Sequence, residues 1–148
     1  MDRAELLLLV VHLAASAAMC GLIWCVQVVH YALFDGVGAD GFAAYERRHQ
    51  RAISWIVGPF MAIEGLSALA VAVLLRDEVG TVLVVASLAL LTVIHASTVL
   101  LQVPAHGRLT SGYDADVVTQ LVRTNWIRTV GWTARTVVAA AMVVVAAS

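Results

Sequence analysis

Residues 81–103 read TVLVVASLALLTVIHASTVLLQV and contain a single ionisable side chain, His95. An α-helix needs about 20 mainly apolar residues to cross the hydrocarbon core of a bilayer. This stretch is long enough, and its other polar side chains are hydroxyls and one glutamine. It therefore predicts a membrane-spanning helix.

Three further stretches have the same character, at residues 6–30, 53–75 and 124–147. Backbone polar groups in lipid must be bonded within their own segment, which α-helices achieve. Short connections make successive helices antiparallel neighbours. The expected fold class is all-α, an integral membrane up-down four-helix bundle, with residues 1–148 forming one membrane domain. Within the first connection, residues 40–49 are expected to form a short helix of their own in the membrane interface.

The composition of the chain supports the same class. Of 148 residues, 61% are hydrophobic and 13% are charged, and the net charge is −1. Soluble domains are usually about 45–50% apolar and about 25% charged. The lipid bilayer is thus the expected partner, and the lack of a basic excess excludes a nucleic-acid-binding protein.

Arginine placement predicts the orientation in the membrane. Arg47, Arg48, Arg51 and Arg108 lie in the first and third connections, whereas the other side carries only Arg3 and Arg76, each beside acidic residues. Basic loops stay in the cytoplasm. Both termini are therefore expected outside. A chain rich in Ala and Val, with arginine and no lysine, is typical of GC-rich bacteria, so we expect the bacterial cytoplasmic (inner) membrane.

Polar side chains inside the predicted spans are the main functional signal. Such residues are costly in lipid and mark functional sites by default. Helical spacing places them on one stripe of each helix, and the stripes are expected to overlap in the cytoplasmic half. The residues concerned are Gln27, His30, Glu64, His95, Asn125, Arg128, Trp132 and Arg135.

The site hypothesis gives these residues separate roles. Glu64, His95, Asn125 and Arg128 are the candidate catalytic residues, with Glu64 as a base and Arg128 holding an oxyanion or carbonyl group. Substrate binding is assigned to three more residues, Gln27, Trp132 and Arg135. The alternative for Glu64 and Arg135 is that they lie at one depth, neutralise each other and hold two helices together.

A metal or haem site is a second possibility that the sequence leaves open. Glu46 and His49 have the Glu-x-x-His spacing found in di-iron bundles. His30, His95 and Glu64 would complete a site for iron or copper, and His30 with His95 would suit the two axial positions of a haem. The motif occurs only once, which favours the alternative that Glu46 and His49 are solvated neighbours.

Two short motifs carry a resemblance to a known family. Residues 21–29 lead into Tyr31-Ala32-Leu33, and Asn125-Trp126-Ile127-Arg128-Thr129 opens the last span. Together with the span layout, these resemble the anthrone-oxygenase-like family of small four-helix membrane proteins. The resemblance implies oxidation of a lipophilic phenolic or anthrone-like substrate, with Asn125 and Arg128 at the matching positions. The histidines, Glu46 and Glu64 depart from the family pattern.

The leading functional hypothesis is a membrane oxidoreductase acting on a lipophilic aromatic or quinone-type molecule that enters from the lipid. One alternative is a non-catalytic accessory or structural subunit of a membrane complex, in which the polar stripes are interhelical bonds. Another is a small proton-coupled transporter, since intramembrane carboxylates and histidines relay protons. The sequence leaves open whether the chain forms a homo-oligomer.

Overall fold

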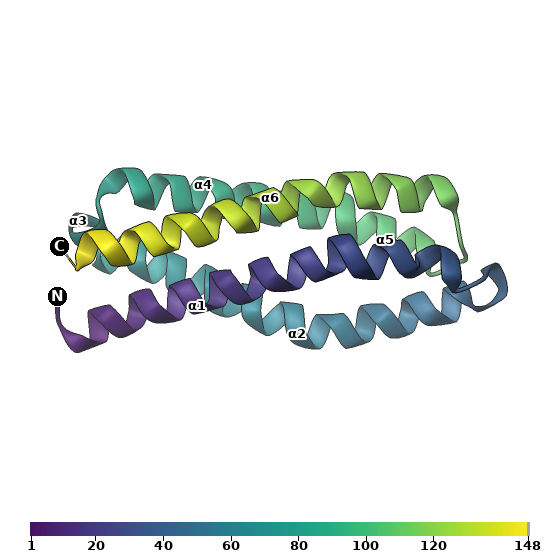
Figure 1. The fold of residues 1–148 in the computed structure, drawn as a ribbon, viewed down its shortest axis with the longest axis horizontal. Helices are drawn as coiled ribbons and strands as arrows, with labels where there is room; N and C mark the ends of the chain where they lie inside the picture. Colours follow the sequence, from purple (N-terminus) through teal and green to yellow (C-terminus); the bar gives the residue numbers. More distant parts are fainter. Residues whose placement is uncertain (148) are drawn as a thin grey trace.

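The computed structural model describes residues 1–147 and is built from helices joined by short turns (Figure 1). The first rod consists of α1 (Arg3–Cys25), the π-helical turn η1 (Val26–His30) and the 3-10 segment η2 (Tyr31–Gly36). The second rod is α2 (Ala39–Leu74). These two rods form an antiparallel pair.

The second half of the chain repeats this arrangement. The short α3 (Arg76–Val79) leads into the third rod, which consists of α4 (Thr81–Ser97), the π-helical turn η3 (Thr98–Gln102) and α5 (Val103–Leu109). The fourth rod is α6 (Ala115–Ala146). All four rods are long and apolar enough to cross a membrane. The prediction of an all-α four-helix bundle is confirmed, and the chain is a multi-pass membrane protein by the length and composition of its helices.

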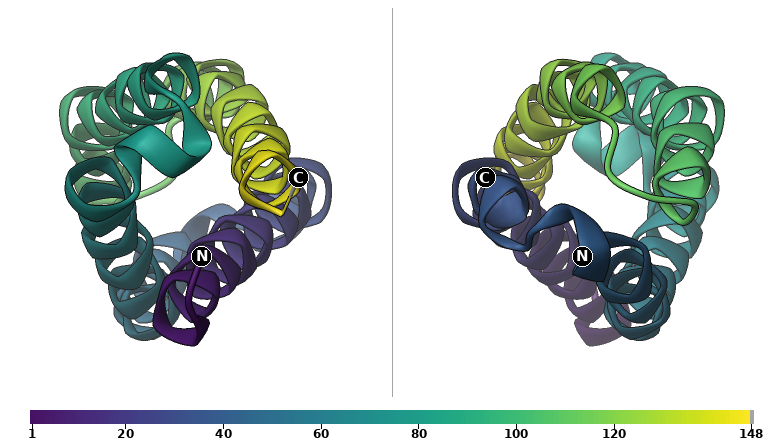
Figure 2. Two further views of the ribbon diagram at one scale, coloured as in Figure 1. Left: turned by 90° about the vertical axis from the view of Figure 1, so that its left-hand side faces the viewer. Right: turned by 90° about the vertical axis from the view of Figure 1, so that its right-hand side faces the viewer.

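The rods pack around a common axis, as the end-on views in Figure 2 show. α1 lies against both α2 and α6, and α6 also lies against α4. The contact between α2 and α4 is much sparser. The bundle is therefore loosest along the α2–α4 side.

Two tight turns reverse the chain at opposite ends of the bundle. Gly38, before α2, has φ of 78°, and Gly80, before α4, has φ of 86°. Side chains with a Cβ rarely adopt this region of backbone space. Asp114 starts the last rod, because its carboxylate accepts hydrogen bonds from the backbone N–H groups of Asp116 and Val117.

The structure corrects the prediction of a separate interfacial helix. Residues 39–49 are the first turns of α2 and continue directly into its apolar part. Phe42 is fully buried and packs in a core cluster with Phe34, Leu109 and Leu121. Burial of this ring against the other rods explains why the segment joins the bundle.

Two predicted span boundaries also change. The third rod continues past Pro104 to Leu109, and α6 begins at Ala115 rather than near residue 124. Proline is tolerated in the first turn of a helical segment, and Pro104 lies there in α5. The rods are therefore longer than the apolar stretches from which the spans were predicted, because their outer turns are apolar on one face only.

Candidate functional site

A cavity of about 270 Å³ lies between the rods. Side chains from α1, α2, the third rod and α6 line it. At its apolar part the lining residues are Met19, Leu22, Ile23, Val26, Ile53 and Val57. At its polar part they are Tyr31, His49, Gln50, Gln102, His106 and Arg128. The cavity thus has the mixed lining that suits an apolar molecule with a polar group.

Irregular helix geometry surrounds this cavity. Both π-helical turns contribute lining residues, Val26 from η1 and Gln102 from η3. On α2, Gly58 lines the cavity beside Pro59, which removes a backbone donor inside the helix. Single π-helical turns inside longer helices occur frequently at functional sites. Two of the four rods therefore change helix type where they face the cavity, and α2 carries its proline beside it.

A carboxylate–imidazole–phenol chain lies at the polar part. His106 Nδ1 is 2.6 Å from Glu46 Oε1, and the Tyr31 hydroxyl is 3.2 Å from His106 Nε2. Gln50 donates to the same Glu46 oxygen at 3.0 Å and to the His106 carbonyl oxygen at 2.8 Å. Glu46 is fully buried. A carboxylate only accepts hydrogen bonds, so Nδ1 carries the imidazole proton and Nε2 is left to accept one.

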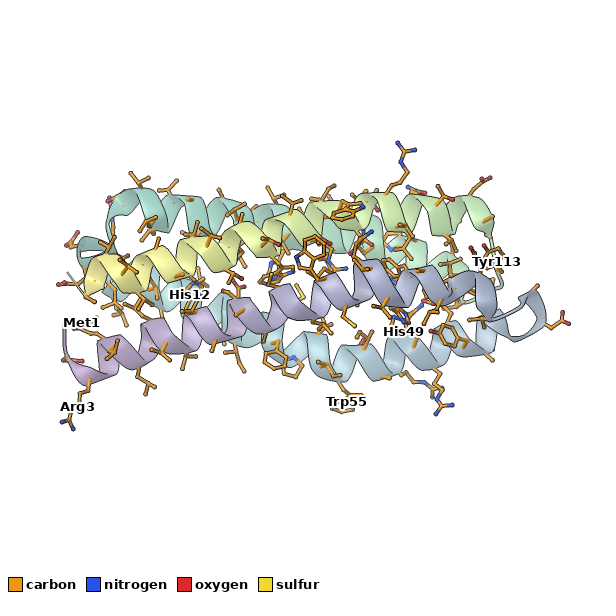
Figure 3. The ribbon with its side chains drawn as sticks, in the orientation of Figure 1. Met1, Arg3, His12, His49, Trp55 and Tyr113 are labelled. Carbon is orange, nitrogen blue, oxygen red and sulfur yellow. The ribbon has the colours of Figure 1, made fainter. Side chains whose placement is uncertain are left out.

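Two further histidines extend this cluster. The rings of His30 and His49 stack with centroids 4.1 Å apart, and His49 lies 5.7 Å from the His106 ring. In Figure 3, His49 lies on the side of the bundle's middle toward Tyr113, and His12 lies on the opposite side. The expectation that Glu46 is a solvated neighbour of His49 is wrong for Glu46, because the carboxylate is buried against the third rod.

Arg128 reaches the cavity from α6. Its Nη1 donates to Asn125 Oδ1 at 3.1 Å, and Asn125 Nδ2 donates to Gln27 Oε1 at 2.8 Å. All three side chains are buried. The two amides are neutral, so they orient the guanidinium without neutralising its charge.

A second polar cluster involves none of the residues that line the cavity. Glu64 forms an ion pair with Arg135, and Arg135 also donates to the Ser87 carbonyl oxygen. His12 Nδ1 lies 3.0 Å from the Ser67 hydroxyl, which donates to the Glu64 carbonyl oxygen at 3.0 Å. The prediction that Glu64 and Arg135 lie at one depth is confirmed, and their pairing joins α2 to α6.

The residues predicted from sequence are therefore divided between separate places. Of the catalytic and substrate-binding candidates, only Arg128 lines the cavity. Asn125 and Gln27 stand behind it, whereas Glu64 and Arg135 form the other cluster. Trp132 is fully buried in a core cluster with Met19, Ile23 and Ile94. His95 lies in the last turns of α4, where its Nδ1 is 3.0 Å from the Leu91 carbonyl oxygen.

The proposed metal and haem ligands are not assembled. The structure gathers His30, Glu46 and His49, but Glu64 is paired with Arg135 and His95 is bonded within its own helix. Across residues 1–147, no group of three His, Cys, Asp or Glu side chains is arranged to hold a metal ion. His30 stacks on His49. The five residues predicted as metal ligands therefore do not form one site in the described structure.

His106, Tyr31 and Gln50 are the site residues that sequence reasoning missed. His106 lies beyond residue 103, where the third apolar stretch ends, so hydropathy alone does not place it inside the bundle. A usable signal existed in the spacing of four between Gln102 and His106, and between Glu46 and Gln50. Residues four apart share a helix face, and both pairs meet at the polar part of the cavity.

The fold and the site thus define a multi-pass four-helix membrane protein with a mixed polar and apolar cavity between its helices. No protein-family model, curated protein or solved structure matches the chain. The resemblance to the anthrone-oxygenase-like proteins therefore stays a prediction that rests on its two short motifs.

Proposed function

We propose that this chain is a membrane-embedded, oxygenase-like oxidoreductase acting on a lipophilic aromatic or quinone-type molecule bound in the cavity. The observation that carries the proposal is the Glu46–His106–Tyr31 chain beside Arg128. The site combines a base that a buried carboxylate orients, a neighbouring cation and an apolar lining. Such a combination can remove a proton from an apolar substrate.

His106 is the general base in this proposal. Glu46 holds the imidazole in the tautomer whose Nε2 is the proton acceptor, and it stabilises the imidazolium once the proton has arrived. Tyr31 donates to Nε2 and lines the cavity, so it lies between the base and a bound molecule. Arg128 stabilises the negative charge that the substrate gains when it loses the proton.

Dioxygen is the oxidant in the proposed reaction. An anthrone-type substrate loses one proton from its CH₂ group to the Tyr31 oxygen as Tyr31 passes its own proton to His106 Nε2, and the resulting carbanion reduces dioxygen. The CH₂ group becomes a carbonyl group, one oxygen atom enters the product, and the other leaves as water with the two hydrogens. The four electrons lost by carbon are those gained by the dioxygen molecule, so no metal or haem enters the balance.

Oxygen uptake with anthrone as the probe tests this proposal. Purified protein in phosphatidylcholine nanodiscs is expected to accelerate uptake and form the quinone, while His106→Ala and Glu46→Gln lose about 10²–10⁴-fold of that rate. Glu78→Gln, an exposed acid at the other end of the bundle, is the matched control. Loss of activity in His95→Ala but not in His106→Ala would move the base to His95, one of the catalytic candidates predicted from the sequence.

A non-catalytic subunit of a membrane complex is the second candidate. The Glu64–Arg135 pair and the His12–Ser67 contact are the interhelical bonds that this alternative predicts. If it holds, Glu46→Gln and His106→Ala change the unfolding temperature or complex assembly and no turnover is found. The open cavity beside the Glu46–His106 chain favours the enzyme.

We also propose that the chain spans the bacterial cytoplasmic membrane with both termini outside. Trp24, Trp55 and Trp126 are exposed, and the rings of Trp24 and Trp126 contact each other at 5.6 Å. From Trp55 to Leu74, α2 extends about 29 Å, close to the thickness of the hydrocarbon core. The tryptophans thus suit one hydrocarbon boundary, with Arg47, Arg48 and Arg51 on its cytoplasmic side.

A further inference from the structure

Two buried arginines on α6 have opposite electrostatic surroundings. Arg135 is paired with the Glu64 carboxylate, so its charge is neutralised. Arg128, two helical turns earlier, has only 7% of its surface exposed, and no carboxylate in residues 1–147 lies within ion-pair distance of it. Arg128 is therefore a buried cation whose counter-charge the described protein does not provide.

The hydrogen bonds of Arg128 are also incomplete. Its Nη1 donates to Asn125, but its buried Nε has no partner in the described part of the chain. A guanidinium presents five N–H donors in a planar fork that fits an oxyanion. An unpaired buried charge is strongly unfavourable unless a counter-charge joins it. Because Arg128 lines the cavity, the natural place for that counter-charge is a ligand.

The remainder of the cavity determines what the anion is attached to. Met19, Ile23, Ile53 and Val57 line it with apolar groups, and its volume of about 270 Å³ accommodates a body of roughly naphthalene size. Glu46, the buried acid of the polar cluster, is already bonded to His106 and Gln50. It is therefore engaged and does not serve as the counter-ion of Arg128.

Access to the cavity follows from the loosest side of the bundle. The exposed residues Ser54 and Gly58 of α2 and Val103 of α5 line the cavity, and α2 makes few contacts with the third rod. Trp55, which Figure 3 shows pointing away from the bundle, lies between these α2 residues in sequence. The opening thus lies at the membrane–water interface. An amphiphilic molecule at this depth has its polar group near water and its apolar body in lipid.

We propose that the cavity binds a lipophilic molecule bearing one oxyanion, a carboxylate or an ionised phenol or enol, and that Arg128 pairs with it. Asn125 and Gln27 are positioning residues that aim the guanidinium. This ligand class rests on the function proposed above, because it describes the substrate of the same site. Binding of the ligand, however, can be measured without any turnover. The body of the ligand lies against the apolar lining and enters between α2 and the third rod.

Binding of 2-naphthoate and of uncharged 2-naphthamide, which has nearly the same shape, tests the proposal. Equilibrium dialysis against protein in phosphatidylcholine nanodiscs, with empty nanodiscs subtracted, gives both dissociation constants at pH 7.5. We expect naphthoate to bind at least about tenfold more tightly, because hydrogen bonds to charged groups are the strong ones. Equal binding of the two probes in the wild-type protein would overturn the proposal without any variant.

Variants then locate the preference for the anion. Arg128→Gln is expected to weaken naphthoate about tenfold or more and to leave naphthamide within about twofold. Arg123→Gln, an exposed arginine on the same helix, is the matched control and should change neither constant. Val57→Phe fills the apolar part and should weaken both probes. An anion preference that survives Arg128→Gln, or that Arg123→Gln removes equally, contradicts the proposal.

2-Naphthol separates the two sources of an oxyanion. It is neutral in water at pH 7.5, so the naphtholate absorption band of the bound probe would show that the site ionises its ligand. Binding of naphthoate without that band would indicate a ligand that arrives already charged. A preference for naphthoate without any oxidation of anthrone would leave this inference standing and remove the proposed function.

Discussion

Buried charge is distributed unevenly at the scale of single residues. Arg135 and Glu64 neutralise each other, whereas Arg128 is held only by the neutral amide of Asn125. Removing one partner of a buried ion pair leaves an uncompensated charge, which is strongly destabilising. Replacing both partners leaves no buried charge. The two arginines should therefore respond differently to substitution.

The Glu64–Arg135 pair should behave as a unit in unfolding. Glu64→Gln and Arg135→Gln each leave one buried charge, and each should lower the free energy of unfolding by about 3–5 kcal/mol. The double variant should lose clearly less than the sum of the two. Thermal unfolding in mild detergent measures this, with naphthoate binding as the check that the cavity is intact. Strictly additive losses would show that the two side chains do not interact.

Tyr113 lies in the turn before α6, outside the membrane-spanning helices. Its hydroxyl donates to Asp35 Oδ1 at 2.5 Å, and this hydrogen bond to a carboxylate raises the pKa of Tyr113 above its usual 10.0. Because the folded pKa is raised, the stabilisation is present below about pH 10 and is lost as pH rises through the folded value. The turn should therefore loosen only in strong base.

Absorbance titration of tyrosinate measures that shift. The difference between wild type and Tyr113→Phe isolates this phenol from the other two tyrosines, and its midpoint should lie above 10.0. Asp35→Asn should bring the midpoint back toward the ordinary value. A midpoint that Asp35→Asn leaves unchanged would show that the carboxylate is not responsible.

At the scale of helices, one close approach joins α4 to α6. A Cβ on Gly131 would lie 2.7 Å from Cγ1 of the fully buried Ile94. On α2, Gly65 has open space, with nothing within 4 Å of an added Cβ. Only one of these two glycines is therefore required by packing.

Alanine at the two glycines should separate packing from helix propensity. Gly131→Ala forces Ile94 to shift and should cost about 1–3 kcal/mol, as overpacking does, which exceeds the gain in helix propensity of about 1 kcal/mol. Gly65→Ala keeps the propensity gain without a clash, so its unfolding temperature should stay equal or rise. Equal behaviour of the two variants in thermal unfolding would contradict the close α4–α6 approach.

At the scale of the whole molecule, both termini and α3 lie at one end, and the arginine-rich segments lie at the other (Figure 1). The rods are longer than a hydrocarbon core requires, since α2 alone has 36 residues and about 20 suffice to cross it. The helical turns beyond that length extend past the exposed tryptophans at the arginine-rich end of the bundle. The cavity therefore lies near one membrane surface.

Cysteine labelling tests the proposed orientation. In a background with Cys20→Ser and Cys25→Ser, we expect Asp77→Cys on intact cells to react with a membrane-impermeant maleimide. Ser111→Cys should react only after the cells are opened, because its side of the membrane carries the arginines. The opposite pattern would place the termini in the cytoplasm and the cavity near the outer surface.

Much of the fold was predictable from sequence. The apolar runs gave the number of helices, because backbone groups in lipid must be satisfied within each segment. Glu64 and Arg135 were also predictable as a pair, since two opposite charges at one depth attract strongly in a poorly polar medium. The length of the rods was not predictable from hydropathy, because their outer turns are apolar on one face only.

The sequence by itself determined the membrane class, the four spans and the depth of each intramembrane charge. Only the tertiary structure brought His106 to Glu46, 60 positions apart, and left Arg128 facing a cavity without a carboxylate. Spacing along one helix specifies which residues share a face, but not how that helix is rotated against its neighbours. Here the π-helical turns η1 and η3 shift the faces of two rods, so the grouping of polar residues depended on packing between rods.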